Sequence, residues 1–215
     1  TIDTKQYCVV FTKLVTYGRM HTMFLIVGLG NPGEEYARTK HNAGWIVLEG
    51  VVGDAKWNTS KNAHADFVPG QIGNEAVVYS KPMTFMNESG SAVSFFAKKE
   101  NVVANQIIVL HDELDLAMGT VRISFDRGAG GHNGITSIQD SLGTSAFIRI
   151  RIGVSPVDDE GNVRRPTAGA QQDFVLKQFN NADYEKITAL VPKVKELIEM
   201  IVTKGLEAAM TKYNQ

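Results

Sequence analysis

The segment between residues 24 and 44 constrains the fold of this chain more than any other. Four apolar residues, Phe24–Val27, form a pattern typical of a buried β-strand, and a glycine-rich turn follows at once. Further along, a single histidine, His41, is followed directly by an amide side chain. Polar residues on loops at the carboxyl ends of strands form the functional sites of α/β folds. The segment therefore predicts an α/β domain with Asn31 and His41 at one edge of its sheet.

The glycine-rich turn also resembles a dinucleotide-binding fingerprint. Its glycines Gly28, Gly30 and Gly33 satisfy the pattern G-x-G-x-x-G after a strand. Pro32 argues against that interpretation, because a proline has no backbone N–H to offer a pyrophosphate. It also disfavours a helical conformation at Asn31, where the fingerprint requires a helix to begin. We therefore do not expect a dinucleotide site in this turn.

Length and composition indicate one domain. A chain of 215 residues, 43% of them hydrophobic, is sufficient for a single α/β domain with a substantial core. No apolar run reaches the ~18 residues that a membrane-spanning helix needs. The single cysteine, Cys8, excludes an internal disulfide and is consistent with a reducing compartment, so we expect a cytoplasmic protein. Because the net charge is −1, any RNA binding must come from local basic clusters.

Residues 1–22 stand apart from the rest of the chain. They carry scattered charges and lack the apolar centre of a signal peptide, whereas Met23 begins the first convincing strand. We expect residues 1–22 to be an extension outside the fold and residues 23–215 to form the domain.

The remaining chain alternates between strand and helix patterns. The strand candidates are Phe24–Val27, Ala76–Ser80, Gln106–Leu110, Thr120–Phe125 and Ile148–Val154. Helical patterns cover Ala43–Val52, Glu88–Lys99 and Gly134–Leu142. This alternation predicts a single three-layer α/β domain, in which helices flank a mixed, mostly parallel twisted sheet.

The last third of the chain contains a long amphipathic pattern. Apolar residues recur at helical spacing from Ile187 to Ile201, and Asn181 or Asp183 could cap the helix. Pro192 lies inside the pattern and predicts a kink or a division. Before it, the polar loop Ser155–Gly169 is long for a compact domain, which is typical of a lid or a binding loop.

Four short segments place polar side chains beside the predicted strand ends. The glycines of the last segment, Gly-Ala-Gly-Gly-His-Asn-Gly, allow positive φ and a close approach to a ligand. In chain order the segments contain Asn31, Tyr36 and His41, then Asn87, then Asp112, and then His132 and Asn133. We expect Asp112 to follow the buried strand rather than to lie in it.

Together these segments resemble the bacterial peptidyl-tRNA hydrolase family. The matching motifs, in order, are Gly-Leu-Gly-Asn-Pro-Gly, Thr-Lys-His-Asn-Ala-Gly, Thr-Phe-Met-Asn, His-Asp-Glu-Leu-Asp and Gly-Gly-His-Asn-Gly. One such motif would be weak, but five in the right order are very specific, and the resemblance extends over Met23–Gln215. It implies a monomeric α/β enzyme, without metal or other cofactor, that hydrolyses the ester joining a peptide to the 3′-terminal ribose of tRNA.

The resemblance also implies roles for individual residues. His41 would be the general base, Asp112 its orienting partner, and Asn31 a contact near the scissile ester that helps to discriminate blocked from free aminoacyl groups. The site for the tRNA end would contain Tyr36, Phe85, Met86, Asn87, His132 and Asn133. The chemistry agrees, because a neutral imidazole can deprotonate water, a carboxylate can fix its tautomer, and an amide can donate to the developing negative charge.

Three other functions fit parts of the sequence. A serine hydrolase would need G-x-S-x-G, which Ser89-Gly90-Ser91 does not supply. An RNA-binding module without chemistry would not need both His41 and Asp112. A metal site could draw on side chains whose spacing matches no zinc signature, namely His111, Asp112, Glu113, Asp115 and His132.

RNA contacts are expected beside the site. Arg149 and Arg151 alternate on a predicted strand and therefore share one face. Family members often carry a lysine that clamps the tRNA 5′ phosphate, in the strand leading to the glycine-rich loop. Here Ser124 occupies that position, and Arg151 matches the second half of the clamp. Arg122 or Arg127 could replace the first half, and Arg164 and Arg165 could join this surface, unless these arginines are simply a solvated face.

Overall fold

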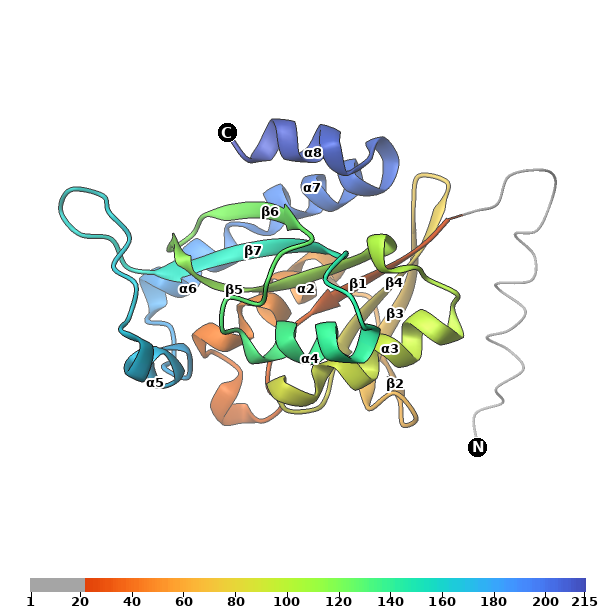
Figure 1. The fold of residues 1–215 in the computed structure, drawn as a ribbon, viewed down its shortest axis with the longest axis horizontal. Coiled ribbons are helices and arrows are strands. Elements are labelled where there is room, and N and C mark those ends of the chain that lie inside the picture. The colour runs from red at the N-terminus through yellow and green to blue at the C-terminus, as the bar shows by residue number, and fades with distance from the viewer. Residues whose placement is uncertain (1–21) are drawn as a thin grey trace.

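The computed structural model describes residues 22–215, which form one seven-stranded sheet with helices on both faces (Figure 1). The expectation for residues 1–22 therefore falls, apart from Thr22, outside the described residues. The strands are β1 (Met23–Gly28), β2 (Asn58–Ser60), β3 (Ala65–Ile72), β4 (Glu75–Pro82), β5 (Ile107–Ala117), β6 (Val121–Phe125) and β7 (Ile148–Ser155). The helices are α2 (Ala43–Val52), α3 (Ser89–Lys99), α4 (Asn133–Leu142), α5 (Gln171–Val175), α6 (Asn181–Thr188), α7 (Val191–Lys204) and α8 (Leu206–Tyr213).

The sheet is mixed, as expected, with the order β2-β3-β4-β1-β5-β7-β6. Its four central strands, β4, β1, β5 and β7, are parallel to one another, whereas β2, β3 and β6 add antiparallel pairings at the two edges. The carboxyl ends of the central strands therefore meet at one edge, where an α/β fold places its ligands.

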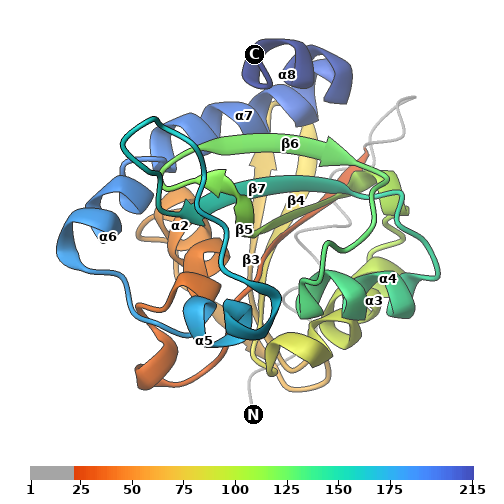
Figure 2. The same cartoon turned by 60° about the vertical axis from the view of Figure 1, so that its left-hand side comes forward.

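Helices cover both faces, which makes the three layers of the expected fold (Figure 2). Helices α3 and α4 pack together on one face, and α2, α6, α7 and α8 lie on the other. Among residues 22–215, no helix is both long enough and apolar enough to span a membrane.

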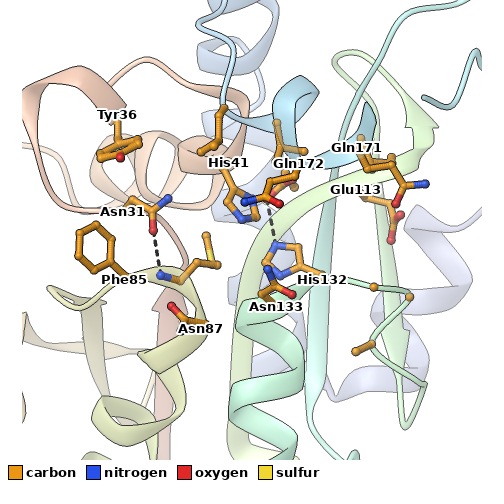
Figure 3. A pocket seen from close by; sticks show the side chains of 18 of the residues that line it. Asn31, Tyr36, His41, Phe85, Asn87, Glu113, His132, Asn133, Gln171 and Gln172 are labelled. Carbon is orange, nitrogen blue, oxygen red and sulfur yellow. Dashed lines mark hydrogen bonds and ion pairs between the residues drawn. The ribbon is translucent and has the colours of Figure 1, made fainter. Parts of the chain in front are cut away.

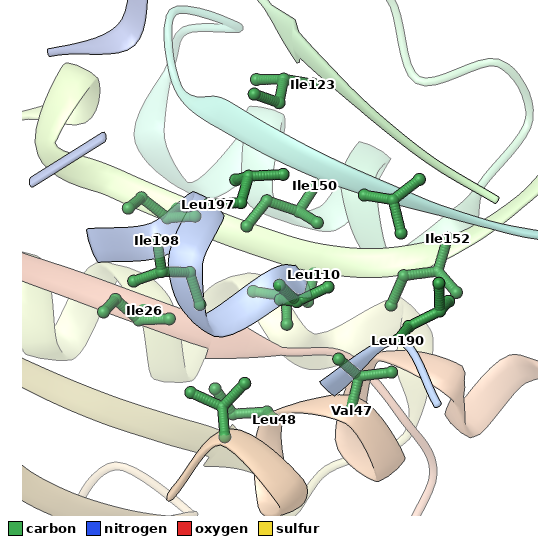
Figure 4. Packing of buried hydrophobic residues seen from close by; sticks show 14 of the residues in the cluster. Ile26, Val47, Leu48, Leu110, Ile123, Ile150, Ile152, Leu190, Leu197 and Ile198 are labelled. Atoms are coloured by element: carbon green, nitrogen blue, oxygen red, sulfur yellow. The ribbon is translucent and has the colours of Figure 1, made fainter. Parts of the chain in front are cut away.

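Alternating side chains of the central strands form two hydrophobic cores. In β1, Ile26 packs with α2 and α7, while Leu25 and Val27 pack toward α3 and α4. Figure 4 shows the first core, where Leu110 and Ile150 meet helical residues such as Leu197. Burying a side chain of this size stabilises the fold by ~1.5–3 kcal/mol. Apolar residues on both faces explain why these strands appear in the sequence as continuous apolar runs.

Comparison with the predicted elements shows where local sequence was sufficient. The five predicted strands and the three predicted helices before the C-terminal third are present, with small differences at their ends except in β5. Strands β2 and β3 were not predicted. The first has only three residues, and Pro69 and Gly70 interrupt the pattern of the second near the edge of the sheet. Strand β5 continues to Ala117, so Asp112 lies within the strand and not after it.

The C-terminal amphipathic pattern is divided, as Pro192 predicted. Helix α6 ends at Thr188, and Pro192 lies in the first turn of α7, where its missing N–H costs nothing. The N-cap prediction was wrong by one residue. The side chain of Asn180 caps α6 by accepting a hydrogen bond of 2.8 Å from the N–H of Asp183.

Gly44 lets the start of α2 lie directly on the ends of β1 and β5. A Cβ atom at this position would lie 2.3 Å from the carbonyl oxygen of Leu110 and 2.7 Å from the backbone nitrogen of Leu29. No flexible side chain can move aside there, because both neighbours are backbone atoms. This close approach sets the height of the preceding residues, including His41, above the sheet.

Replacing Gly44 by alanine should therefore destabilise the protein. Alanine favours a helix by up to ~1 kcal/mol over glycine, but the steric conflict should lower the free energy of unfolding by ~1–3 kcal/mol. Denaturant unfolding followed by circular dichroism measures the difference. Gly169→Ala is the control, because a Cβ atom there meets no atom within 4 Å. Equal stability of the two variants would contradict the proposed packing constraint.

Candidate active site

The predicted polar segments meet in one pocket at the carboxyl edge of the central strands. The pocket has a volume of about 690 Å³, within the range of ligand sites. Figure 3 shows Asn31, Tyr36 and Phe85 on one side and Gln171 and Glu113 on the other. Its lining also includes His41, Met86, Asn87, Asp112, Leu114, Ala129, Gly130, Gly131, His132, Asn133, Ala168, Gln172, Val175 and Leu176.

His41 lies in a 3₁₀ turn, Lys40–Asn42, that leads directly into α2. His41 is 8% exposed, and its Nδ1 atom lies 2.8 Å from Oδ1 of Asp112. Because Asp112 is an acceptor, Nδ1 carries the proton in the neutral ring. Its Nε2 atom has no hydrogen-bond partner among residues 22–215, so a lone pair is available in the pocket.

Asp112 holds a second imidazole as well as His41. Its Oδ1 atom lies 2.9 Å from Nε2 of His132, the residue that caps α4. The side chain of Asp112 is only 2% exposed. The hydrogen bonds of this buried carboxylate therefore come from the two histidines, within the part of the chain that the structure describes.

The charges of this group shift the pKa values in different directions. Burial opposes ionisation of Asp112, but the two imidazoles outweigh it and hold the carboxyl pKa far below its usual range. Burial likewise disfavours the charged form of His41, yet the charge and hydrogen bond of Asp112 raise its pKa overall. Burial and the neighbouring His132 lower the pKa of His111 well below its ordinary value, so His111 is neutral.

Asn31 presents a hydrogen-bond donor to the pocket. Its Oδ1 atom accepts from the backbone N–H of Met86 at 2.8 Å, which leaves the side-chain NH₂ group for a ligand (Figure 3). The side chain of Asn42 holds the backbone of Asn31 by two hydrogen bonds, of 2.9 and 3.0 Å. The residue directly after His41 thus fixes the position of Asn31, a role that its sequence neighbourhood did not reveal.

The other predicted residues for the tRNA end also line the pocket. Tyr36 is half-buried and Phe85 is 55% exposed. Asn87 and Asn133 are exposed, and their side-chain amides have no hydrogen-bond partner among the described residues. Met86 is buried beneath them and packs in the core on the α3 and α4 side. These residues leave aromatic and amide groups open to a ligand.

One wall of the pocket was missed by sequence reasoning. Residues of α5 form it, and this helix of five residues is too short to give a periodic signal. The only indication was the long polar loop before it, which predicted a lid or a binding loop. Arg165 fastens that loop by pairing with Asp115 and by donating to the carbonyl of Gly130 at 3.5 Å.

The arginines beside the pocket differ from the expected RNA-binding face. Arg149 is 3% exposed and donates to the carbonyls of Arg127 and Gly128, so it supports the glycine-rich loop from within and is not on a surface. Arg151 is half-buried, and its Nε atom pairs with Oε2 of Glu113 at 2.8 Å. Arg122 donates to the carbonyl of Tyr213 at 3.2 Å.

The side-chain atoms that could bind a metal ion are the same ones that form the hydrogen bonds of His41, Asp112 and His132. Among residues 22–215, the potential ligand atoms that cluster are those of His41, Asp112 and His132, which lie within 4.8 Å of one another. This differs from the set considered in the sequence, because Glu113 and Asp115 instead pair with arginines. The contacts of the three residues with one another are those of a hydrogen-bonded chain.

Comparisons with known proteins identify the family to which the chain is similar. The family model described as peptidyl-tRNA hydrolase matches residues 25–215. A peptidyl-tRNA hydrolase of Rhodococcus erythropolis is 37% identical over 190 residues, covering 87% of this chain and 96% of that protein. One from Mycolicibacterium smegmatis is 40% identical over 188 residues, covering 86% and 94%.

The fold agrees as well. The crystal structure of peptidyl-tRNA hydrolase from Acinetobacter baumannii matches with a TM-score of 0.80 and 30% identity, covering 92% of this chain and 97% of that one. The motifs recognised in the sequence, the pocket that they form, and these matches over nearly the whole length lead to one conclusion. The chain belongs to the peptidyl-tRNA hydrolase family, whose members hydrolyse the ester bond of peptidyl-tRNA.

Proposed function

We propose that His41 is the general base in hydrolysis of the ester between a peptide, or an N-blocked amino acid, and the 3′ end of tRNA. The observation that carries this proposal is the 2.8 Å contact between Nδ1 of His41 and Asp112, which leaves Nε2 open to the pocket. The reaction releases free tRNA for reuse in translation. The domain acts as a monomer in the cytoplasm and needs no metal, because neutral imidazole can activate water by itself.

The proposed steps use the contacts of His41 and Asp112. Nε2 of His41 accepts a proton from water as the oxygen attacks the ester carbonyl, and the ring becomes an imidazolium. Asp112 keeps the reactive tautomer in place and stabilises that positive charge. The proton on Nε2 then passes to the departing ribose oxygen, which restores the neutral base.

Asn31 is proposed to act on the carbonyl oxygen. Its oxygen is occupied by the N–H of Met86, so its NH₂ group points a donor at the place where negative charge develops. The same donor can recognise the first amide of a blocked aminoacyl group. A free amino group is a cation and offers no such acceptor, which gives Asn31 a part in discrimination.

The tRNA end is proposed to lie along the other open side chains of the pocket. Tyr36 and Phe85 offer aromatic faces to the bases of the CCA end, and Asn87 and Asn133 offer amides to ribose and base edges. The acceptor stem lies toward Arg151, whose two terminal nitrogens have no partner among the described residues. These nitrogens suit a phosphate group.

A variant without the proposed base tests the reaction. His41→Asn retains an N–H that can reach Asp112 but lacks Nε2, so turnover of N-blocked aminoacyl-tRNA should fall by ~10²–10⁴ with little change in tRNA affinity. Release of tRNA is measured with and without a chelator, and free aminoacyl-tRNA serves as the control substrate. His64→Asn, the same change at an exposed histidine, should leave turnover normal. Near-normal turnover of His41→Asn would remove His41 from the mechanism.

The pH profile tests the partnership with Asp112. The charge of Asp112 raises the pKa of His41, so in Asp112→Asn that pKa should fall and the acidic limb of the rate profile should move to lower pH. The maximal rate should also fall by ~10²–10⁴, because the amide no longer fixes the reactive tautomer. Asp54→Asn, the same change at an exposed aspartate that does not line the pocket, is the control. An unmoved acidic limb in Asp112→Asn would show that Asp112 does not act through His41.

Salt dependence tests the phosphate contact. Arg151→Ala should weaken binding of different tRNAs to a similar extent and flatten the slope of log affinity against log salt by ~0.7–0.9. Hydrolysis of a blocked amino acid on a short 3′ fragment should be almost unchanged. Lys193→Ala, on a helix that contributes nothing to the pocket, is the control. Equal losses on the fragment and on whole tRNA would place Arg151 in the catalytic centre instead.

A further inference from the structure

His132 has both of its ring nitrogens engaged within the protein. Its Nδ1 atom accepts hydrogen bonds from the backbone N–H groups of Gly134 and Ile135, at 3.1 and 3.3 Å, and so caps α4. A nitrogen that accepts two N–H groups carries no proton, so in the neutral ring the proton is on Nε2. That N–H donates to Oδ1 of Asp112 at 2.9 Å. No polar atom of the imidazole is left for a substrate.

Its position also fixes the orientation of this imidazole. The side chain is only 9% exposed, and turning the ring over would break both capping hydrogen bonds as well as the contact with Asp112. His132 is therefore a donor to Asp112 whose orientation is fixed by the start of α4.

His41 and His132 share one oxygen atom of Asp112. Both contacts end on Oδ1, and the two ring centroids are 4.9 Å apart. A donor from His132 withdraws part of the negative charge that Asp112 presents to His41. It also prevents the carboxylate from turning away from the base.

We propose that His132 is a positioning residue that sets the basicity of His41 through Asp112, and that it does not contact the substrate. This inference deepens the proposed function, because it rests on His41 as the base. It differs from the substrate contact that the family resemblance implied for His132. The helix cap, the shared carboxylate and the base form one chain of hydrogen bonds, from the backbone of α4 to the pocket.

Apart from Asp112, the charged side chains near His41 have interaction partners of their own. Glu113 on β5 pairs with Arg151 of β7, and Lys40 lies over the rings of Phe174 and Phe179. The wall formed by α5 contributes neutral amides to the pocket. On β5, the neutral His111 donates from Nδ1 to the backbone carbonyl of Asp112 at 2.7 Å and lies edge-on to His132. Arg149 of β7 is directed at backbone carbonyls of the glycine-rich loop.

Two substitutions separate the cap from the donor. His132→Ser retains an N-capping oxygen but is too short to reach Asp112. His132→Gln can place an amide N–H near the position of Nε2 but offers no acceptor at the position of Nδ1. Each variant is prepared as the full chain, and the pKa of His41 is measured directly by NMR titration of its ring. The rate profile and the separate values of kcat and KM on N-blocked aminoacyl-tRNA are then compared.

The two variants should differ in the pKa of His41. In His132→Ser that pKa should rise by roughly 0.5–1 pH unit, since Asp112 keeps its full charge for His41, and the acidic limb of kcat should follow. In His132→Gln the pKa should stay close to that of the unaltered protein, although the thermal stability should fall with the loss of the cap. KM should change little in either variant.

Other outcomes would overturn the inference. An unchanged pKa of His41 in His132→Ser, or the same rise in both variants, would show that the donor of His132 does not set it. A raised KM with an unmoved profile would instead make His132 a substrate contact. Failure of the proposed function is distinguishable, because the NMR pKa of His41 would then shift in His132→Ser while the rate profile did not follow it.

Discussion

Burial of the Asp112 carboxylate is the constraint on which the rest of the site depends. An ionised carboxylate with a side chain only 2% exposed is stable in a protein interior only if donors surround it. Its two donors are imidazoles that precede helices on opposite faces of the sheet, His41 before α2 and His132 before α4. The carboxylate therefore connects the N-terminal ends of α2 and α4, one on each face of the sheet, to the same residue of β5. Removing either imidazole leaves the buried Asp112 carboxylate without one of its hydrogen-bond donors.

Backbone contacts around β1 hold the remaining functional groups in register with that carboxylate. The N–H of Leu29 donates to the carbonyl of Leu110, and the carbonyl of Leu29 accepts from the N–H of Trp45 in α2. Together with the absence of a side chain at Gly44, these bonds place the turn with His41 against the ends of two strands. Asn42 then fixes Asn31 by two hydrogen bonds. Asn31 and His41 are thus positioned by backbone geometry, and groups held in this way need little reorganisation during a reaction.

Local sequence predicted a structural feature where that feature depends on one strand or helix alone. It did not predict features that depend on packing between distant segments. The central strands could be predicted, because burial on both faces leaves runs such as Ile107–Leu110. The position of Asp112 within β5 could not, because pairing with β7 extends the strand past its apolar part. The alternation of Arg149 and Arg151 was correct, but which of them is covered depends on the glycine-rich loop packing from outside the strand. The wall formed by α5 depends on such long-range packing entirely.

The chemistry proposed here assigns different tasks to the two ends of the substrate. Product tRNA retains every phosphate of the substrate, so contacts such as the one proposed for Arg151 would bind both equally and would not favour the transition state. The pairing of Arg151 with Glu113 limits the strength of that contact, because a phosphate must compete with a carboxylate. The peptide and its ester are what distinguish substrate from product. In the proposed mechanism, selectivity for the substrate arises where the NH₂ group of Asn31 and the wall formed by α5 line the same pocket as His41.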